Sequence, residues 1–116
     1  MEIYEALKNW LLTEHASVGI DRLGHNPGEL AIFPQGVQLL RQWEDVLGNR
    51  YRKVRYRFWV RLVLPAGEVA AKLVLRLQQE APKVGFQATE GSLRKTASDG
   101  LAIYEIRFIT EREEKI

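Results

Sequence analysis

Apolar and polar residues alternate with a period of two in the middle of the chain. Between Val54 and Leu64 every even-numbered residue is apolar and large, whereas arginine dominates the odd-numbered positions. Because successive side chains of a strand point to opposite faces, this alternation predicts a strand with one face in the core. The other face is predicted to be a cationic surface with one large aromatic side chain. Its charged and aromatic residues are Arg55, Arg57, Trp59 and Arg61.

A partner strand is predicted just before this one. The stretch Gly36–Leu64 has the pattern of two long strands, and Gly48 with Asn49 provides residues that tolerate positive φ in a tight turn between them. The residues before Gly36 are rich in glycine and proline, which indicates a connecting region. We expect only short strands in that region, around Val18–Leu23 and Glu29–Phe33.

Two segments have apolar residues at helical spacing, and each predicts an amphipathic helix that packs on the core. The first runs from Glu2 to Leu12, with its apolar stripe at Ile3, Leu7, Trp10 and Leu11. The second runs from Glu68 to Ala81, with its stripe at Val69, Ala70, Leu73, Val74 and Leu77. Pro82 is expected to end the second helix because proline cannot continue the hydrogen-bond ladder.

The last third of the chain predicts two more strands, at Val84–Thr89 and Leu101–Glu111, with Asp99 and Gly100 in a hairpin turn. The intervening stretch, Gly91–Gly100, is predicted to be a mobile basic loop. The final residues, which include three glutamates, are expected to be a solvated strand end that frays.

This order of elements predicts an α+β fold, with a mainly antiparallel sheet of about four to five strands and two helices packed on one face. A chain of 116 residues is expected to form a single domain, 1–116. Its composition, 46% apolar and 28% charged, is typical of a globular protein. We expect no membrane span and no signal peptide, and therefore synthesis in the cytoplasm. The absence of cysteine excludes disulfides and thiolate metal sites.

Residues with catalytic potential are few. His15 and His25 fall in segments predicted to be loops, and their spacing fits neither a helical pair nor a zinc motif. Asp21 could pair with His25, but no recognisable nucleophile accompanies them. Gly91–Gly100 lacks the Gly-Lys-Ser/Thr ending of a phosphate loop. We therefore expect a protein that is not an enzyme and that has no cofactor, no metal and no catalytic residue.

The net charge of +2, from 17 basic and 15 acidic residues, gives no strong overall attraction to nucleic acid. The charges are nevertheless segregated. Arg50–Arg61 holds six basic residues and no acidic one, whereas Thr110–Ile116 holds three glutamates.

The basic strand supports two functional hypotheses. In the first, arginine and tryptophan exposed together form a protein assembly interface, since both are enriched at interface hot spots. In the second, the arginines bind nucleic-acid phosphates while Trp59 or Tyr51 stacks on bases. A third reading is a solvated arginine face with Trp59 under a loop. Near-neutral charge and the lack of a known nucleic-acid motif favour assembly.

Three strings carry a resemblance to a known family: "NPGELAIFPQG", then "RYRKVRYRFWVRLVLP", then, after a helix, "GSLRKTASDGLAIYEIRFITEREE". In this order they resemble the small minor capsid or tail-terminator proteins of long-tailed phages and of prophages of Gram-positive bacteria. The resemblance spans about Leu7 to Glu111. It implies an α+β fold and a ring, commonly hexameric, that caps the tail tube and joins it to the head.

The resemblance also implies the partners and the location: copies of the chain itself, the tail tube and head–tail connector proteins, in the virion after assembly in the bacterial cytoplasm. Nucleic acid would only pass through the ring without specific contacts. The strand alternation predicts which side chains line the interface, and the turn at Gly48–Arg52 and the loop Ser92–Lys95 are expected to reach neighbouring subunits or the tube. The candidate interface residues are Arg52, Arg55, Arg57, Trp59, Arg61, Arg94 and Lys95.

Overall fold

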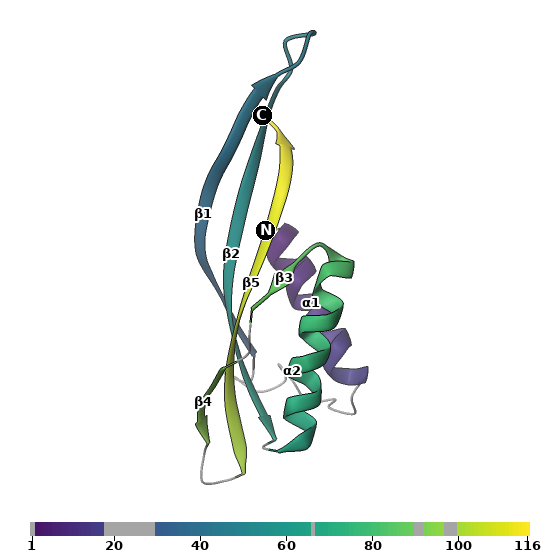
Figure 1. The fold of residues 1–116 in the computed structure, drawn as a ribbon, viewed down its shortest axis with the longest axis vertical. Helices are drawn as coiled ribbons and strands as arrows, with labels where there is room; N and C mark the ends of the chain where they lie inside the picture. The colour runs from purple at the N-terminus through teal and green to yellow at the C-terminus, as the bar shows by residue number, and fades with distance from the viewer. Residues whose placement is uncertain (1, 18–29, 66, 90–91, 97–99) are drawn as a thin grey trace.

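The computed structural model describes residues 2–17, 30–65, 67–89, 92–96 and 100–116. The fold is α+β, as predicted: an antiparallel sheet carries two helices on one face (Figure 1). The elements in chain order are α1 (Glu2–Ser17), β1 (Leu30–Glu44), β2 (Arg50–Pro65), α2 (Glu68–Glu80), the 3-10 helix η1 (Ala81–Val84), β3 (Gln87–Ala88), β4 (Ser92–Thr96) and β5 (Leu101–Lys115).

The sheet is built around the long antiparallel pair β2 and β5, which runs from Tyr51 opposite Lys115 to Pro65 opposite Leu101. β1 pairs with the other side of β2 over its whole length. Along the outer side of β5 lie two short strands, β4 next to the start of β5 and β3 at its middle. The strand order is therefore β1-β2-β5-β3, with β4 also on β5.

Both predicted helices form, and both apolar stripes face the sheet. Leu7, Trp10 and Leu11 of α1 are buried, and α2 is buried at Ala70, Leu73, Val74 and Leu77. They pack on the even-numbered face of β2 and β5, where the Trp10 ring meets Phe108 edge to face at 5.8 Å. α1 continues to Ser17, beyond the predicted end at Leu12, and Glu14 in this extension forms an ion pair with Arg76 of α2. Neither helix in the described ranges is long and apolar enough to cross a membrane.

β1 is one strand where the sequence predicts two separate pieces. The short strand expected at Glu29–Phe33 and the long strand expected from Gly36 are continuous, and Pro34 lies inside the strand. Proline is tolerated here because β1 is an edge strand, and the register shifts between Pro34 and Gly36. The strand expected at Val18–Leu23 lies outside the described residues.

Three expectations for the last third are wrong. Most of the predicted strand Val84–Thr89 is absent, because η1 continues the chain past α2 and Gly85, with φ of 83°, closes it, which leaves only the two-residue β3. Ser92–Thr96, predicted as a mobile loop, is strand β4 on β5. The C-terminal end does not fray, since β5 pairs with β2 as far as Lys115.

The two histidines have different outcomes. His15 belongs to helix α1 and not to a loop, because the helix runs five residues further than its apolar stripe indicates. His25, Asp21 and Asp99 lie outside the described residues.

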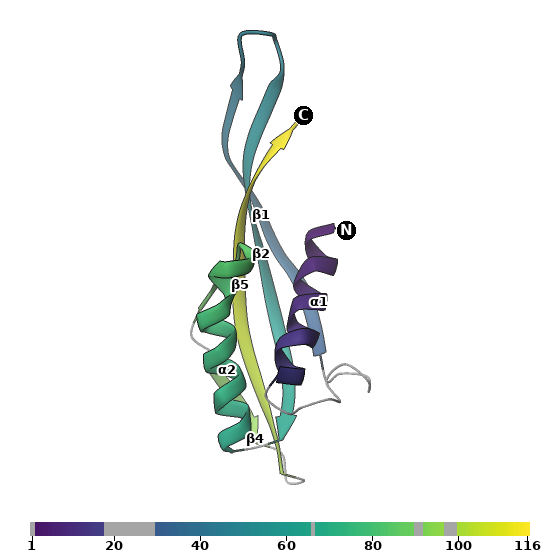
Figure 2. The ribbon, with the colours of Figure 1, turned by 90° about the vertical axis from the view of Figure 1, so that its right-hand side faces the viewer.

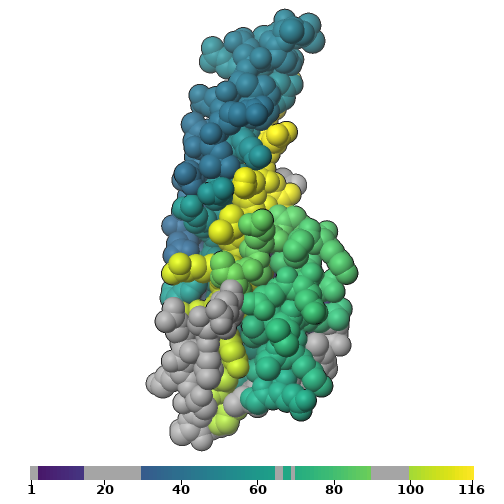
Figure 3. Space-filling model, viewed as in Figure 1, coloured from purple at the N-terminus to yellow at the C-terminus, as the bar shows by residue number. Residues whose placement is uncertain are grey.

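The molecule is elongated, with extents of 59 × 23 × 23 Å. Beyond the helices the sheet continues alone as a narrow projection that ends in the β1–β2 turn (Figures 1, 2 and 3). We call this projection the arm, and define it as Val37–Glu44 of β1, Arg50–Tyr56 of β2 and Thr110–Lys115 of β5. The arm is three-stranded, because β3 and β4 pair only with earlier residues of β5.

Candidate interaction face

The face of the sheet opposite the helices carries the arginine-rich row of β2, and no described element covers it (Figure 1). We call it the open face, defined by the odd-numbered residues of β2 and β5 and their β1 neighbours. Arg57 and Arg61 are exposed, whereas Arg55 and Trp59 are half-buried. The even-numbered residues Val54, Phe58, Val60, Leu62 and Leu64 are buried, which confirms the predicted alternation.

The open face is mixed in charge, and not purely cationic as the β2 pattern predicts. The register places three glutamates of β5 opposite basic residues of β2: Arg61 opposite Glu105, Arg55 opposite Glu111, and Lys53 opposite Glu113. Glu111 also lies 3.5 Å from Arg55 Nη2 and 4.0 Å from Lys53 Nζ. Such exposed pairs stabilise the fold little, but they offset the positive charge of the strand.

Arg57 is the exception in this row, because its β5 neighbour is Ile109. Its Nη2 atom donates a hydrogen bond to Gln38 Oε1 at 3.1 Å. Arg107 lies diagonally across, opposite Trp59. A hollow of about 380 Å³ is lined by Gln35, Arg57, Thr89, Arg107 and Ile109. No carboxylate is among these lining residues, so positive charge persists at this point of the open face.

Two aromatic pairs lie along the β1–β2 side of the open face. Phe33 and Trp59 are direct cross-strand neighbours with ring centroids 5.4 Å apart, and Phe33 remains 45% exposed. Trp43 stacks on Tyr51 at 5.8 Å, with the Arg41 guanidinium 4.4 Å from the Trp43 ring. Trp59 is thus covered in part by the adjacent strand, and not by a loop of the described chain. Exposed aromatic side chains beside arginine are typical of interface hot spots.

Arg52 does not belong to the open face. It is even-numbered and lies on the same side of β2 as Val54, so the alternation that exposes Arg55 turns it the other way. There, Arg52 Nε lies 2.8 Å from Glu114 Oε1. The Tyr56 hydroxyl donates to the second oxygen of Glu114 at 2.5 Å. Arg52 is therefore engaged within the arm.

These contacts shift two pKa values in opposite directions. The hydrogen bond from Tyr56, aided by Arg52, lowers the pKa of Glu114 below its ordinary 4.5. The same hydrogen bond raises the pKa of Tyr56 above 10.0. Because the Glu114 pKa is lowered, its contribution to the free energy of unfolding is present above pH 4.5 and is lost on acidification. Because the Tyr56 pKa is raised, its contribution is present below pH 10.0 and is lost as the pH rises further.

Tyr56→Phe should therefore lower the free energy of unfolding by about 1 kcal/mol between these pH values, because it removes one partly exposed, charge-assisted hydrogen bond. The difference from wild type should shrink as the pH falls below 4.5 or rises above 10.0. Urea unfolding of both proteins across this pH range checks the prediction. A difference that is constant with pH would show that the hydroxyl acts only through packing.

The turn at the end of the arm is organised by Asp45, a residue that the sequence reasoning missed. Its carboxylate accepts hydrogen bonds from the backbone N–H groups of Leu47 and Asn49, both at 2.9 Å, and from the Asn49 amide and the Tyr51 hydroxyl. These bonds, led by the Asn49 side chain, lower the pKa of Asp45. Gly48 has φ of 85°, as predicted, but Asn49 contributes its side chain and not a positive φ. The sequence feature that could have identified Asp45 is an aspartate at the start of a turn that contains glycine.

Arg94 and Lys95 lie on a different strand from the other candidate residues. Both belong to β4, which lies at the end of the sheet opposite the arm (Figure 1). The register of β4 on β5 shifts between Leu93 and Lys95. The structure thus brings Arg55, Arg57, Trp59 and Arg61 together on the open face and turns Arg52 to the other face. Arg94 and Lys95 belong to β4, which lies across β5 from the Arg61 end of this row.

Comparison with known proteins adds no assignment: no protein-family model matches the chain, and no curated protein matches it significantly. Within the described residues, no group of three His, Asp or Glu side chains is placed to hold a metal ion. The open face and the arm are therefore the features of the molecule that indicate a function.

Proposed function

We propose that this protein is a phage or prophage virion assembly protein, and specifically a tail terminator whose copies form a ring that caps the tail tube and joins it to the head. The observation that carries the proposal is the arm. It extends three strands beyond the helices, and no described strand pairs with its β1 edge or with Thr110–Lys115 of β5. No described element covers its open face, and on the helix side only Gly85 and Phe86 contact Thr110 and Arg112. Unpaired strand edges favour pairing with another chain.

The composition of the open face supports a protein interface. Trp59, Phe33 and Trp43 supply apolar area, and arginines lie beside them. The cross-strand charge pairs leave a surface of alternating sign, which fits a complementary protein surface better than a uniform polyanion. Nucleic-acid binding, the second candidate, is favoured by one feature, the hollow between Arg57 and Arg107.

The proposed mechanism is physical and involves no bond chemistry. Each copy presents one surface to the copy before it and a different surface to the copy after it, and such a heterologous contact closes into a ring by cyclic symmetry. A closed ring on the tube leaves no free site for another tube subunit. The two aromatic pairs are the expected anchors of the contacts with the tube or with connector proteins.

Light scattering over a wide range of protein concentration tests the self-assembly. A monomer has a mass of 13.4 kDa, and we expect a concentration-dependent species near six times that mass. A 13.4 kDa species at every concentration would contradict self-assembly of the chain.

A further inference from the structure

We infer that the ring closes by strand pairing between copies, in which β1 of one copy adds in parallel to the free segment Thr110–Lys115 of β5 in the next. This inference depends on the proposed self-assembly and specifies its contact. A second copy is the occupant because both halves of the contact are present in one chain.

The two free edges have matching direction and position. β1 is antiparallel to β2, and β2 is antiparallel to β5, so β1 and β5 run in parallel. Tyr56 lies between Val37 and Thr110, and Tyr51 lies between Trp43 and Lys115, so both edges span the same length of the arm. Rotation about an axis along the arm preserves strand direction, and it therefore brings β1 of one copy beside β5 of the next in parallel.

We define the same-row register as the one that places side by side the β1 and β5 residues that lie opposite the same residue of β2. This register gives complementary charges on the open face. Arg41 and Glu113 both lie opposite Lys53 in one copy, so the same-row register places Arg41 of one copy beside Glu113 of the next. By the same construction Gln38 comes beside Glu111. All four of these edge side chains are exposed in the single copy, so the contact can form without moving the core.

The other face of the arm gains apolar burial from the same pairing. Val37 is 70% exposed and Leu39 is 53% exposed, and both point to the helix side of the β1 edge. In the same-row register Leu39 of one copy comes beside Arg112 of the next. The Arg112 Nε atom is buried without a hydrogen-bond partner, and its guanidinium lies 5.7 Å from the Phe86 ring. Leu39 of the neighbouring copy would supply apolar contact to the stem of Arg112.

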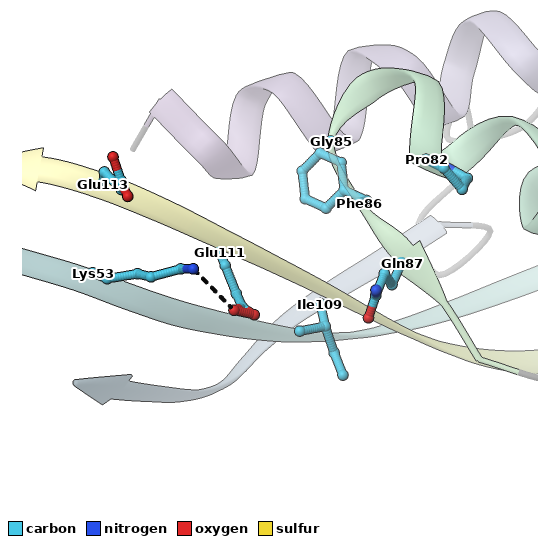
Figure 4. Close-up of a pocket in the computed structure, with 8 residues that line it drawn as sticks. All are labelled: Lys53, Pro82, Gly85, Phe86, Gln87, Ile109, Glu111 and Glu113. Atoms are coloured by element: carbon cyan, nitrogen blue, oxygen red, sulfur yellow. Dashed lines mark ion pairs between the residues drawn. The ribbon is translucent and has the colours of Figure 1, made fainter. Parts of the chain in front are cut away.

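A groove marks the place where the added strand would enter. It has a volume of about 550 Å³ and lies where β3 begins, next to the free edge of β5 (Figure 4). Its walls are formed by η1 and the residues after it, by β5 and by Lys53. The lining residues are Lys53, Pro82, Gly85, Phe86, Gln87, Ile109, Glu111 and Glu113.

A cysteine pair tests the contact directly, because the chain has no cysteine of its own. We expect Gln38→Cys combined with Glu111→Cys, both at exposed positions, to give a ladder of covalent multimers on a non-reducing gel after mild oxidation. Within one copy β2 separates the two positions by about 10 Å, beyond the roughly 7 Å that a disulfide spans between Cα atoms. Each disulfide must therefore join two copies, and the largest rung reports the ring size.

Three controls distinguish the outcomes. Gln38→Cys with Leu75→Cys, an exposed position on α2, should give no ladder, and an equal ladder would mean random collision and overturn the inference. Covalent dimers from Gln38→Cys alone would indicate antiparallel β1–β1 pairing and also overturn it. If the double variant forms the multimer by light scattering when reduced, but gives no ladder after oxidation, the strand pairing is wrong and self-assembly stands. If the double variant, with and without oxidation, and the wild type are all monomeric, both the strand pairing and self-assembly are contradicted.

Discussion

Phe108→Ala is expected to lower the free energy of unfolding by about 3–5 kcal/mol, which is a large part of the stability of an ordinary domain. Phe108 is fully buried, packs edge to face against Trp10 of α1, and lies opposite Phe58 of β2. Ala88 of β3 flanks it on the other side. Its removal would leave a cavity between the sheet and the helices.

The adjacent residue is a matched control for this prediction. Ile109 is half-buried and points to the open face, so Ile109→Ala should cost much less stability than Phe108→Ala. Urea unfolding followed by circular dichroism measures both. Equal losses from the two variants would contradict the assignment of the two faces of β5.

The second large effect is expected on assembly. Arg57→Glu combined with Trp59→Ala should abolish ring formation or joining to the tail tube while the chain stays folded, because both side chains lie on the open face and neither belongs to the buried core. The variant reverses the charge of the one β2 arginine that has no glutamate opposite it, and it removes half of the Phe33–Trp59 pair. Light scattering measures the multimer, and circular dichroism the fold.

Lys72→Glu with Leu75→Ala is the matched control, because it makes the same kinds of change on the exposed side of α2 and should leave assembly intact. Unfolding of the Arg57→Glu, Trp59→Ala variant would contradict the surface assignment. Assembly that persists, together with loss of a salt-sensitive affinity for DNA, would instead favour the nucleic-acid hypothesis.

The fold class, both helices and the two faces of β2 could be predicted because they depend on local periodicity. A helix stripe or a strand alternation is set by neighbours within a few residues, and burial then selects the apolar side. Pro34 and the paired C-terminal end were misjudged for the opposite reason. Whether proline interrupts a strand depends on its place at the sheet edge, and whether a charged end frays depends on a partner strand distant in sequence.

The candidate site was predictable only within one strand. Arg57 and Trp59 followed from the alternation in β2, but Phe33 and Arg107 reach them from other strands through a register that no local pattern specifies. The glutamates that offset the basic row come from β5 for the same reason. Arg52 was assignable from the sequence, since its even number already places it with Val54.

The pairing of β2 with β5 has a consequence for the order of folding. The β1–β2 hairpin joins segments close in sequence, and hairpins form in about 1–10 μs. The third strand of the arm must close a far longer loop, because Tyr51 meets Lys115 only after the chain has passed through α2, β3 and β4. Non-local pairing of this kind slows folding, so we expect the arm to exist first as a two-stranded ribbon in which β2 has no partner on its β5 side. We expect it to become a rigid three-stranded sheet only when β5 pairs with β2.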